Sequence, residues 1–198
     1  MNIGEIKNNT LSNIIKKHKR VAILSKNSME YVSIINYCWK NNSVFIPINI
    51  NYTQDRIKNI LEELNCKIIL IDSDLINYSF DGYKVYDIRE IVNKPLDNIL
   101  KVSNDKIKSN LDNYSNIMFS SGSTTSPKAI LHSISNHYYS AISSIDNMRI
   151  EHDSIYLVTL PFYHISGLSI IMRIILSRSC IAIRPLDQTI LESIEKIK

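Results

Sequence analysis

Residues 117–133 read IMFSSGSTTSPKAILHS, and this stretch decides the fold. An apolar run leads into a loop of Ser, Gly and Thr, after which Pro127 and Lys128 open a second apolar run. Such a loop leaves backbone N–H groups and hydroxyls open to a ligand, and Lys128 adds a positive charge. The stretch therefore predicts two strands joined by a loop that binds the phosphates of a nucleotide.

Two other motifs with a similar spacing are disfavoured by their residue types. A P-loop has the spacing found from Gly122 to Lys128, but Pro127 replaces its second glycine and Ala129 replaces its magnesium-binding hydroxyl. A P-loop also continues as a helix, whereas AILHS is typical of a strand. A penicillin-binding S-x-x-K motif would place Thr125 on a helical turn that the proline breaks. A Ser- and Thr-rich surface loop without a ligand is the structural alternative.

The loop resembles the phosphate-binding motif of the adenylate-forming superfamily, which includes acyl-CoA synthetases, luciferases and adenylation domains. Its pattern, aromatic-T-S-G-[ST]-T-G-x-P-K-G, stands here as FSSGSTTSPKA, residues 119–129. Thr125 and Ala129 replace two of its glycines, and a β-branched residue resists a positive φ. The resemblance implies a catalytic role for Thr124 and Lys128. It also implies that the nucleotide phosphates are bound by Ser120, Ser121, Gly122, Ser123, Thr124 and Lys128.

Length and composition are those of a globular protein. The 198 residues suffice for one large or two small domains, and 44% are hydrophobic and 21% charged. The net charge of +4 comes from scattered basic residues without interleaved aromatics, so we expect no nucleic-acid partner. The longest apolar stretch, 165–176, is too short to span a bilayer, and we expect no membrane partner. No C-x-x-C motif joins Cys38, Cys66 and Cys180, which favours buried free thiols and a cytoplasmic location.

Hydrophobic periodicity predicts alternating strands and helices, with Ser28 and Thr53 as helix caps. We expect strands at 21–25, 43–48, 67–71, 84–86, 116–119, 128–132, 154–160 and 180–184, and helices that begin near 29, 54, 135, 166 and 187. This order predicts an α/β fold of mostly parallel sheets flanked by helices. Residues 73–113 fit a connector with edge structure, so that the chain divides into a first α/β unit, 1–113, and a second one with the phosphate loop, 114–198.

A second motif, LPFYHISGLSI, covers residues 160–170 and begins where a strand is expected to end. Ligands of open α/β sheets gather at such strand ends. The structural alternative is an aromatic core turn with a hydrogen-bonded histidine. The superfamily carries P-x-x-H-x-x-G here, lining the acyl pocket and the route of coenzyme A. The resemblance therefore implies that His164 lies beside the reacting acyl group as a catalytic residue, and that Ser166 and Gly167 shape the substrate pocket.

Other segments resemble the same superfamily. The stretches 21–50 and 52–72 are similar to its early strand–helix–strand and the following helix–strand, so the resemblance covers about residues 20–185. The wording HISGLS at 164–169, with Asn136-His137-Tyr138, resembles one branch of it, the o-succinylbenzoate–CoA ligases of menaquinone biosynthesis. In that branch Arg173 could meet a second carboxylate of the substrate, although we favour a role in helix packing.

The resemblance implies a reaction in two halves. A carboxylate attacks the α-phosphate of Mg-ATP to give an acyl-adenylate and pyrophosphate, and the thiol of coenzyme A then forms a thioester and releases AMP. Members of the superfamily are well over twice this length, so we expect residues 1–198 to be an incomplete N-terminal domain that is too short to be active alone. A separate chain could supply the remainder. We expect no metal site within these residues, since His132 and His137 lack a third ligand. A non-catalytic nucleotide-binding module and an adenylating enzyme of another branch stay open as alternatives.

Overall fold

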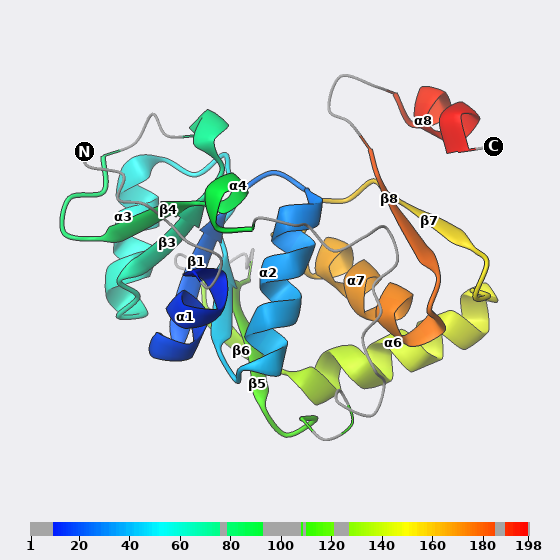
Figure 1. Ribbon diagram of the computed structural model, residues 1–198. Coiled ribbons are helices and arrows are strands. Elements are labelled where there is room, and N and C mark those ends of the chain that lie inside the picture. Colours follow the sequence, from blue (N-terminus) through cyan, green and yellow to red (C-terminus); the bar gives the residue numbers. More distant parts are fainter. Residues whose placement is uncertain are drawn as a thin grey trace.

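The computed structural model describes residues 10–75, 79–92, 108, 110–120, 127–184 and 189–197 (Figure 1). Within these residues the strands form two sheets, one six-stranded in the order β4-β3-β1-β2-β5-β6 and one two-stranded, β7-β8. The strands are β1 (Arg20–Leu24), β2 (Val44–Pro47), β3 (Ile68–Ile71), β4 (Lys84–Asp87), β5 (Tyr114–Phe119), β6 (Ala129–Ser133), β7 (Ile155–Val158) and β8 (Cys180–Ile183). All paired neighbours are parallel except β5 and β6. The predicted mostly parallel α/β architecture is confirmed.

Helices join most of these strands, and two of the predicted caps are present. The helices are α1 (Thr10–Lys17), α2 (Met29–Lys40), α3 (Gln54–Glu63), the 3-10 turn η1 (Ser73–Leu75), α4 (Ile88–Ile91), α6 (Ile134–Met148), α7 (Ile165–Ser177) and α8 (Ile190–Ile197). Ser28 Oγ accepts the backbone N–H of Tyr31 at 3.1 Å, and Thr53 Oγ1 accepts that of Arg56 at 3.4 Å. These bonds satisfy helix N–H groups that have no partner within the helix. The predicted helix starts at 29 and 54 are therefore confirmed.

The central strands β1, β2 and β3 are largely buried on both faces, and successive side chains of each strand point to opposite sides. In β1, Val21 and Ile23 belong to one apolar cluster and Ala22 and Leu24 to the other. Helix α3 contributes to the second cluster, while α1, α2, α4, α6 and α7 contribute to the first. Continuous apolar runs such as 68–71 thus fill two cores at once.

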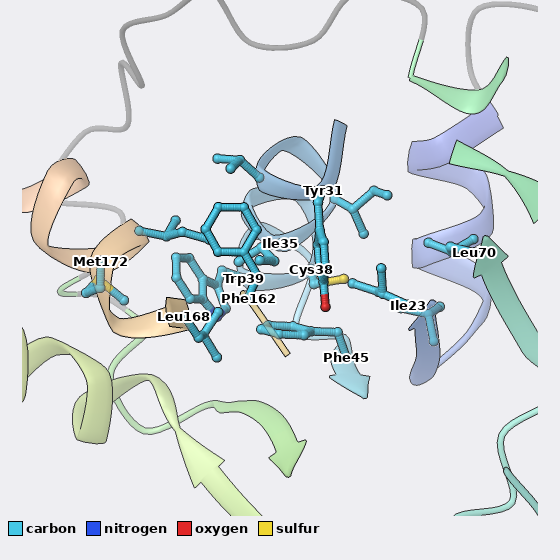
Figure 2. Close-up of a cluster of buried hydrophobic side chains, with 14 of the residues drawn as sticks. Ile23, Tyr31, Ile35, Cys38, Trp39, Phe45, Leu70, Phe162, Leu168 and Met172 are labelled. Atoms are coloured by element: carbon cyan, nitrogen blue, oxygen red, sulfur yellow. The ribbon is translucent and has the colours of Figure 1, made fainter. Parts of the chain in front are cut away.

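The first core continues from the six-stranded sheet to α7 (Figure 2). Trp39 of α2 lies near Phe45 of β2, with ring centroids 6.3 Å apart. Leu168 and Met172 of α7 belong to the same buried cluster, and Figure 2 shows them beside α2. This continuity places the amino end of α7, and the second motif with it, against the main sheet.

The strand before the second motif is shorter than predicted. We expected it to run from 154 to 160, but β7 ends at Val158. Pro161 has no N–H to donate to a neighbouring strand, and the carbonyl of Leu160 accepts a side-chain bond from Asn27 instead. The chain therefore turns out of the sheet before 160.

Strands from both sides of residue 113 share the large sheet. β5 pairs with β2 in parallel, and β6 pairs with β5, so the six-stranded sheet continues past the expected boundary between units. The two-stranded sheet of β7 and β8 stands apart from it. The division into 1–113 and 114–198 stays a prediction.

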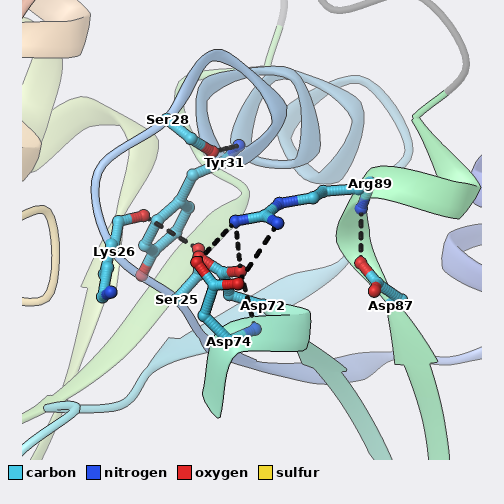
Figure 3. A network of polar contacts seen from close by, with 8 residues as sticks. All are labelled: Ser25, Lys26, Ser28, Tyr31, Asp72, Asp74, Asp87 and Arg89. Carbon is cyan, nitrogen blue, oxygen red and sulfur yellow. Dashed lines mark hydrogen bonds and ion pairs between the residues drawn. The ribbon is translucent and has the colours of Figure 1, made fainter. Parts of the chain in front are cut away.

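The segment after β3, which has little hydrophobic periodicity, is joined to the sheet by ion pairs (Figure 3). Arg89 of α4 lies 2.9 Å from a carboxylate oxygen of Asp72 and 2.9 Å from one of Asp74. Its guanidinium lowers the pKa of Asp74, first through the hydrogen bond between them. Asp72 is buried, so this ion pair joins α4 to the carboxyl end of β3. The predicted edge structure is β4, which lies at the end of the sheet.

Candidate functional site

A cavity of about 510 Å³ lies at the carboxyl ends of β2 and β5. It is lined by Pro47, Asn49, Tyr52, Arg56 and Ile60 from β2 to α3, by Met118, Phe119, Ser120, Pro127, Ile130 and His132 of the β5–β6 hairpin, and by Tyr163, His164, Ile165 and Ser166 at the start of α7. Its size is typical of small-molecule sites. The cavity brings the flanks of the predicted phosphate loop together with the second motif, as expected for strand ends in an open α/β sheet.

The hairpin brings Ser120 and Lys128 together. The backbone N–H of Ser120 donates to the Lys128 carbonyl at 3.0 Å, and the N–H of Lys128 donates to Ser120 Oγ at 3.2 Å. The pairing therefore continues one step beyond the last ladder pair, Phe119 and Ala129. Lys128 is followed by strand β6 and not by a helix, which confirms the distinction from a P-loop. Four predicted phosphate-binding residues lie outside the described residues: Ser121, Gly122, Ser123 and Thr124.

His164 is the residue before the first turn of α7. Its N–H donates to the Pro161 carbonyl at 3.1 Å, and its own carbonyl accepts the N–H of Leu168 at 2.9 Å. The imidazole makes no capping bond to the helix and lies 4.8 Å from the Tyr163 ring, between centroids. Both rings line the cavity. The imidazole is exposed and thus lies where a ligand can reach it.

Ser166 and Gly167 contribute in different ways. Ser166 lines the cavity. Gly167 is buried, and a Cβ on it would overlap the carbonyl oxygen of Pro161 and lie 2.9 Å from that of Leu160. Glycine is therefore needed here because α7 approaches the backbone of the preceding turn closely. Its contribution to the pocket is to set the position of that turn.

Asn27 lies outside the cavity lining but holds the turn before His164, a role that sequence reasoning did not assign to it. Its Nδ2 donates to the Leu160 carbonyl at 2.8 Å, and its Oδ1 accepts the N–H of Phe162 at 2.8 Å. Phe162 is fully buried against Tyr31, with ring centroids 5.5 Å apart. Asn27 therefore fixes the turn that carries His164. An Asn at the end of an expected strand was the only signal for this role.

A buried polar chain lies behind the hairpin and was also missed. Trp39 Nε1 donates to Ser115 Oγ at 2.7 Å, and Ser115 Oγ donates to Asn116 Oδ1 at 2.9 Å. Asn116 Oδ1 lies 2.6 Å from His137 Nε2, which must carry the proton because the amide oxygen only accepts. Burial, with a smaller effect of nearby His132, lowers the pKa of His137 to about 4. The chain joins α2, β5 and α6 near the amino end of β5.

Within the same described ranges, no helix is long and apolar enough to cross a membrane. Nor do these residues contain three or more His, Cys, Asp or Glu side chains grouped so that they could hold a metal ion. Among the described lining residues Arg56 carries the charged side chain, and none of them is an Asp or Glu. The electrostatics of the cavity therefore favour anionic ligands.

Comparisons with known proteins agree with this geometry. Residues 9–198 match the family described as AMP-binding enzyme. A 2-succinylbenzoate–CoA ligase of Staphylococcus aureus is 30% identical over 181 residues, covering 81% of this chain. The structure of o-succinylbenzoate CoA synthetase from Bacillus subtilis with the acyl-adenylate OSB-AMP superposes with a TM-score of 0.75 at 21% identity over 96% of this chain. Another structure of that synthetase, with ATP and magnesium, gives a TM-score of 0.72 at 21% identity over 94% of this chain.

The chain is similar to only part of these proteins. It spans 37% of the length of the Staphylococcus aureus ligase. It covers 50% and 52% of the two Bacillus subtilis chains. At these identities the solved structures establish the likeness in fold.

Proposed function

This chain belongs to the AMP-binding enzyme family, and from that premise we propose that it is the N-terminal portion of a ligase that activates a carboxylic acid with ATP and transfers the acyl group to coenzyme A. The acid we propose is o-succinylbenzoate. Two observations support this choice, namely the identity to a 2-succinylbenzoate–CoA ligase and the fold shared with a synthetase bound to OSB-AMP.

One observation carries the proposal. The two flanks of the phosphate loop, Ser120 and Pro127, line the same cavity as His164 and Ser166. A carboxylate can attack the α-phosphate only if the acid and the nucleotide share one space, with the reacting atoms in line. A surface loop without a ligand would not need to face the second motif across a cavity.

The residues of this chain would act by position and charge. We assign the nucleotide phosphates to Ser120, Ser121, Gly122, Ser123, Thr124 and Lys128. As the carboxylate oxygen bonds to the α-phosphorus and the bond to the β-phosphate oxygen breaks, negative charge grows on the departing pyrophosphate. Loop N–H groups, the Thr124 hydroxyl and the Lys128 ammonium would stabilise that charge. Mg²⁺ would enter with ATP and neutralise part of it.

The acid would occupy the part of the cavity near α7. His164 and Ser166 line this wall and would position the carboxylate and then the acyl-adenylate as coenzyme A approaches. Arg173 does not belong to the lining residues. Its guanidinium carbon lies 5.5 Å from the centroid of the Tyr156 ring, and its Nη2 donates to Ser169 at 3.2 Å. These contacts support a role of Arg173 in packing α7 on β7.

Calorimetry with Mg-ATP tests the phosphate site. We expect Lys128→Ala to weaken binding roughly tenfold or more, because a charge-assisted contact is lost. Lys19→Ala is the matched control, since this exposed lysine precedes β1 at the amino end of the strand, whereas the cavity lies at the carboxyl ends of β2 and β5. Equal affinities of the two variants for Mg-ATP would indicate that the loop is a surface loop that binds no ligand.

Activity tests the acid. With the complete enzyme, we expect pyrophosphate exchange and thioester formation to prefer o-succinylbenzoate over benzoate and hexanoate. The absence of a preference would reject this branch of the family, and exchange that depends on an amino acid would favour an adenylation domain. An intact mass of the protein from its source cells would show whether the remaining parts lie on the same chain or on a separate one. We propose a cytoplasmic reaction, supported by the three free cysteines.

A non-catalytic nucleotide-binding module is the second candidate. It is favoured by the cavity, which combines the flanks of the phosphate loop with the cationic Arg56 and would suffice for binding alone. Binding of Mg-ATP to the 198-residue chain without any acid-dependent pyrophosphate exchange, alone or with the remaining parts supplied, would support it.

A further inference from the structure

Arg56 lies on the α3 wall of the cavity and has no role in the reaction assigned above. We propose that Arg56 binds an anionic group of the ligand, either the polyphosphate of the nucleotide or a second carboxylate on the acid. This inference rests on the proposed function of the same cavity, and it adds a specificity-determining residue to the wall that neither sequence motif reaches.

The arginine is held in place locally. Its backbone N–H donates to Thr53 Oγ1 at the start of α3, and its guanidinium carbon lies 4.7 Å from the centroid of the Tyr52 ring. Such stacking covers one face of the planar guanidinium and leaves its N–H donors directed outward in the plane. Both Arg56 and Tyr52 line the cavity. The pair therefore presents an ordered set of donors to the cavity.

The charge of Arg56 has no counter-charge among the described residues of the cavity wall. The lining residues include no Asp or Glu, and within the described part of the chain no carboxylate lies within 4.0 Å of the Arg56 guanidinium nitrogens. Arg89, in contrast, is held between Asp72 and Asp74. A half-buried cation that faces a cavity of ligand size without an internal partner raises the local concentration of anions.

The position of Arg56 suits the shared chemistry of both anions. The flanks of the phosphate loop, Ser120 and Pro127, belong to the same cavity, so the tail of a nucleotide held by the loop would meet this wall. A dicarboxylic acid whose reacting carboxylate lies near His164 could also extend its second carboxylate toward it. A guanidinium binds phosphate and carboxylate in the same bidentate manner.

Calorimetry on the 198-residue chain tests the inference with the variants Arg56→Gln and Arg56→Lys. Lys58→Gln is the control, because it removes one positive charge from the same helix outside the cavity. The probes are Mg-ATP, AMP, pyrophosphate, o-succinylbenzoate and benzoate. We expect Arg56→Gln to weaken the binding of at least one of these anions roughly tenfold. Arg56→Lys should weaken the binding of that anion less, and Lys58→Gln should leave its affinity unchanged.

The probes separate the two sources of the anion. If Arg56→Gln loses affinity for Mg-ATP and pyrophosphate but not for AMP, Arg56 binds the polyphosphate. If it loses affinity for AMP equally, Arg56 binds the α-phosphate. A loss for o-succinylbenzoate but not for benzoate would assign the second carboxylate. If Arg56→Gln binds every probe as the wild type does while Lys128→Ala loses Mg-ATP, the inference is wrong and the proposed function stands. If the wild type binds none of the probes, both fail.

Discussion

Asn27 and Phe162 are 135 positions apart in the chain, yet the backbone N–H of Phe162 donates to the side-chain oxygen of Asn27 at 2.8 Å. The side-chain N–H of Asn27 in turn donates to the Leu160 carbonyl. One side chain that follows β1 in the sequence thus satisfies two polar groups of the turn that leads to His164. The early part of the chain thereby sets the position of the second motif.

We expect Asn27→Ala to destabilise the protein by about 1–3 kcal/mol, because it leaves the N–H of the buried Phe162 without a partner. Urea unfolding followed by circular dichroism measures this loss. Asn27→Asp keeps the acceptor for Phe162 but places a carboxylate against the Leu160 carbonyl, so only partial recovery is expected. Asn51→Ala removes an exposed amide of the same type and is the control. An unfolding midpoint in urea for Asn27→Ala equal to that of the control would show that the hydrogen bonds of Asn27 do not stabilise the turn.

Glycine is needed at Gly167 and at Gly82 for different reasons, close packing at the first and a positive φ at the second. A Cβ on Gly167 would lie 2.6 Å from the carbonyl carbon of Pro161, so we expect Gly167→Ala to cost about 3 kcal/mol or more through overlap with the backbone. Gly82 has open space around it but a φ of +85°. Gly82→Ala should therefore cost about 1 kcal/mol from backbone strain alone. Urea midpoints compare them, and equal costs would show that α7 shifts freely away from the turn.

Thiol chemistry should follow burial. Cys38 and Cys66 are buried, and burial raises the pKa of both thiols. Cys180 is half-buried, which departs from the expectation that all three thiols are buried. Because the thiolate is the reactive form, iodoacetamide should modify Cys180 first in the native protein and the other two only in urea. Mass spectrometry of digests identifies the sites, and native Cys180→Ser should take up no label. Rapid native labelling of Cys38 would contradict the described core.

The order of strands and helices was predictable because it depends on local patterns. Continuous apolar runs mark strands that are buried on both faces, and Ser28 and Thr53 cap helices within three residues of themselves. The strand after Lys128 was predictable for the same reason, since Pro127 and AILHS exclude a helix there, whereas its antiparallel pairing with β5 was not predicted. The family resemblance then supplied the candidate roles of the loop and of His164.

What sequence reasoning missed depends on contacts between distant segments. The cavity has walls from α3, the hairpin and α7, and no local pattern indicated that Arg56 faces it. The tie from Asn27 to Phe162 and the bond between Trp39 and Ser115 join residues 135 and 76 positions apart. The helix α4 was missed because its four residues are too few to show a helical pattern of apolar side chains. The ion pair between Arg89 and Asp72, which joins it to β3, could not be read from the sequence.

The buried His137 should make stability depend on pH. Its pKa is lowered from 6.5 to about 4 in the folded protein, chiefly by burial. Between these two values the unfolded chain binds more protons, so the free energy of unfolding rises with pH through this window. The contribution is complete above pH 6.5 and is lost as the pH falls toward 4. At about 1.4 kcal/mol per pH unit it amounts to on the order of 3 kcal/mol.

Urea unfolding at several pH values between 4 and 7 measures this dependence, with His137→Gln as the test variant. Glutamine can still donate to Asn116 Oδ1 but does not titrate, so the slope of stability against pH should flatten while the protein stays folded. His132→Gln is the matched control, because the pKa of this half-buried neighbour is also lowered by burial and contributes in the same direction. If the slope flattens only in His132→Gln, the cavity-facing histidine and not the buried one is the group that resists protonation.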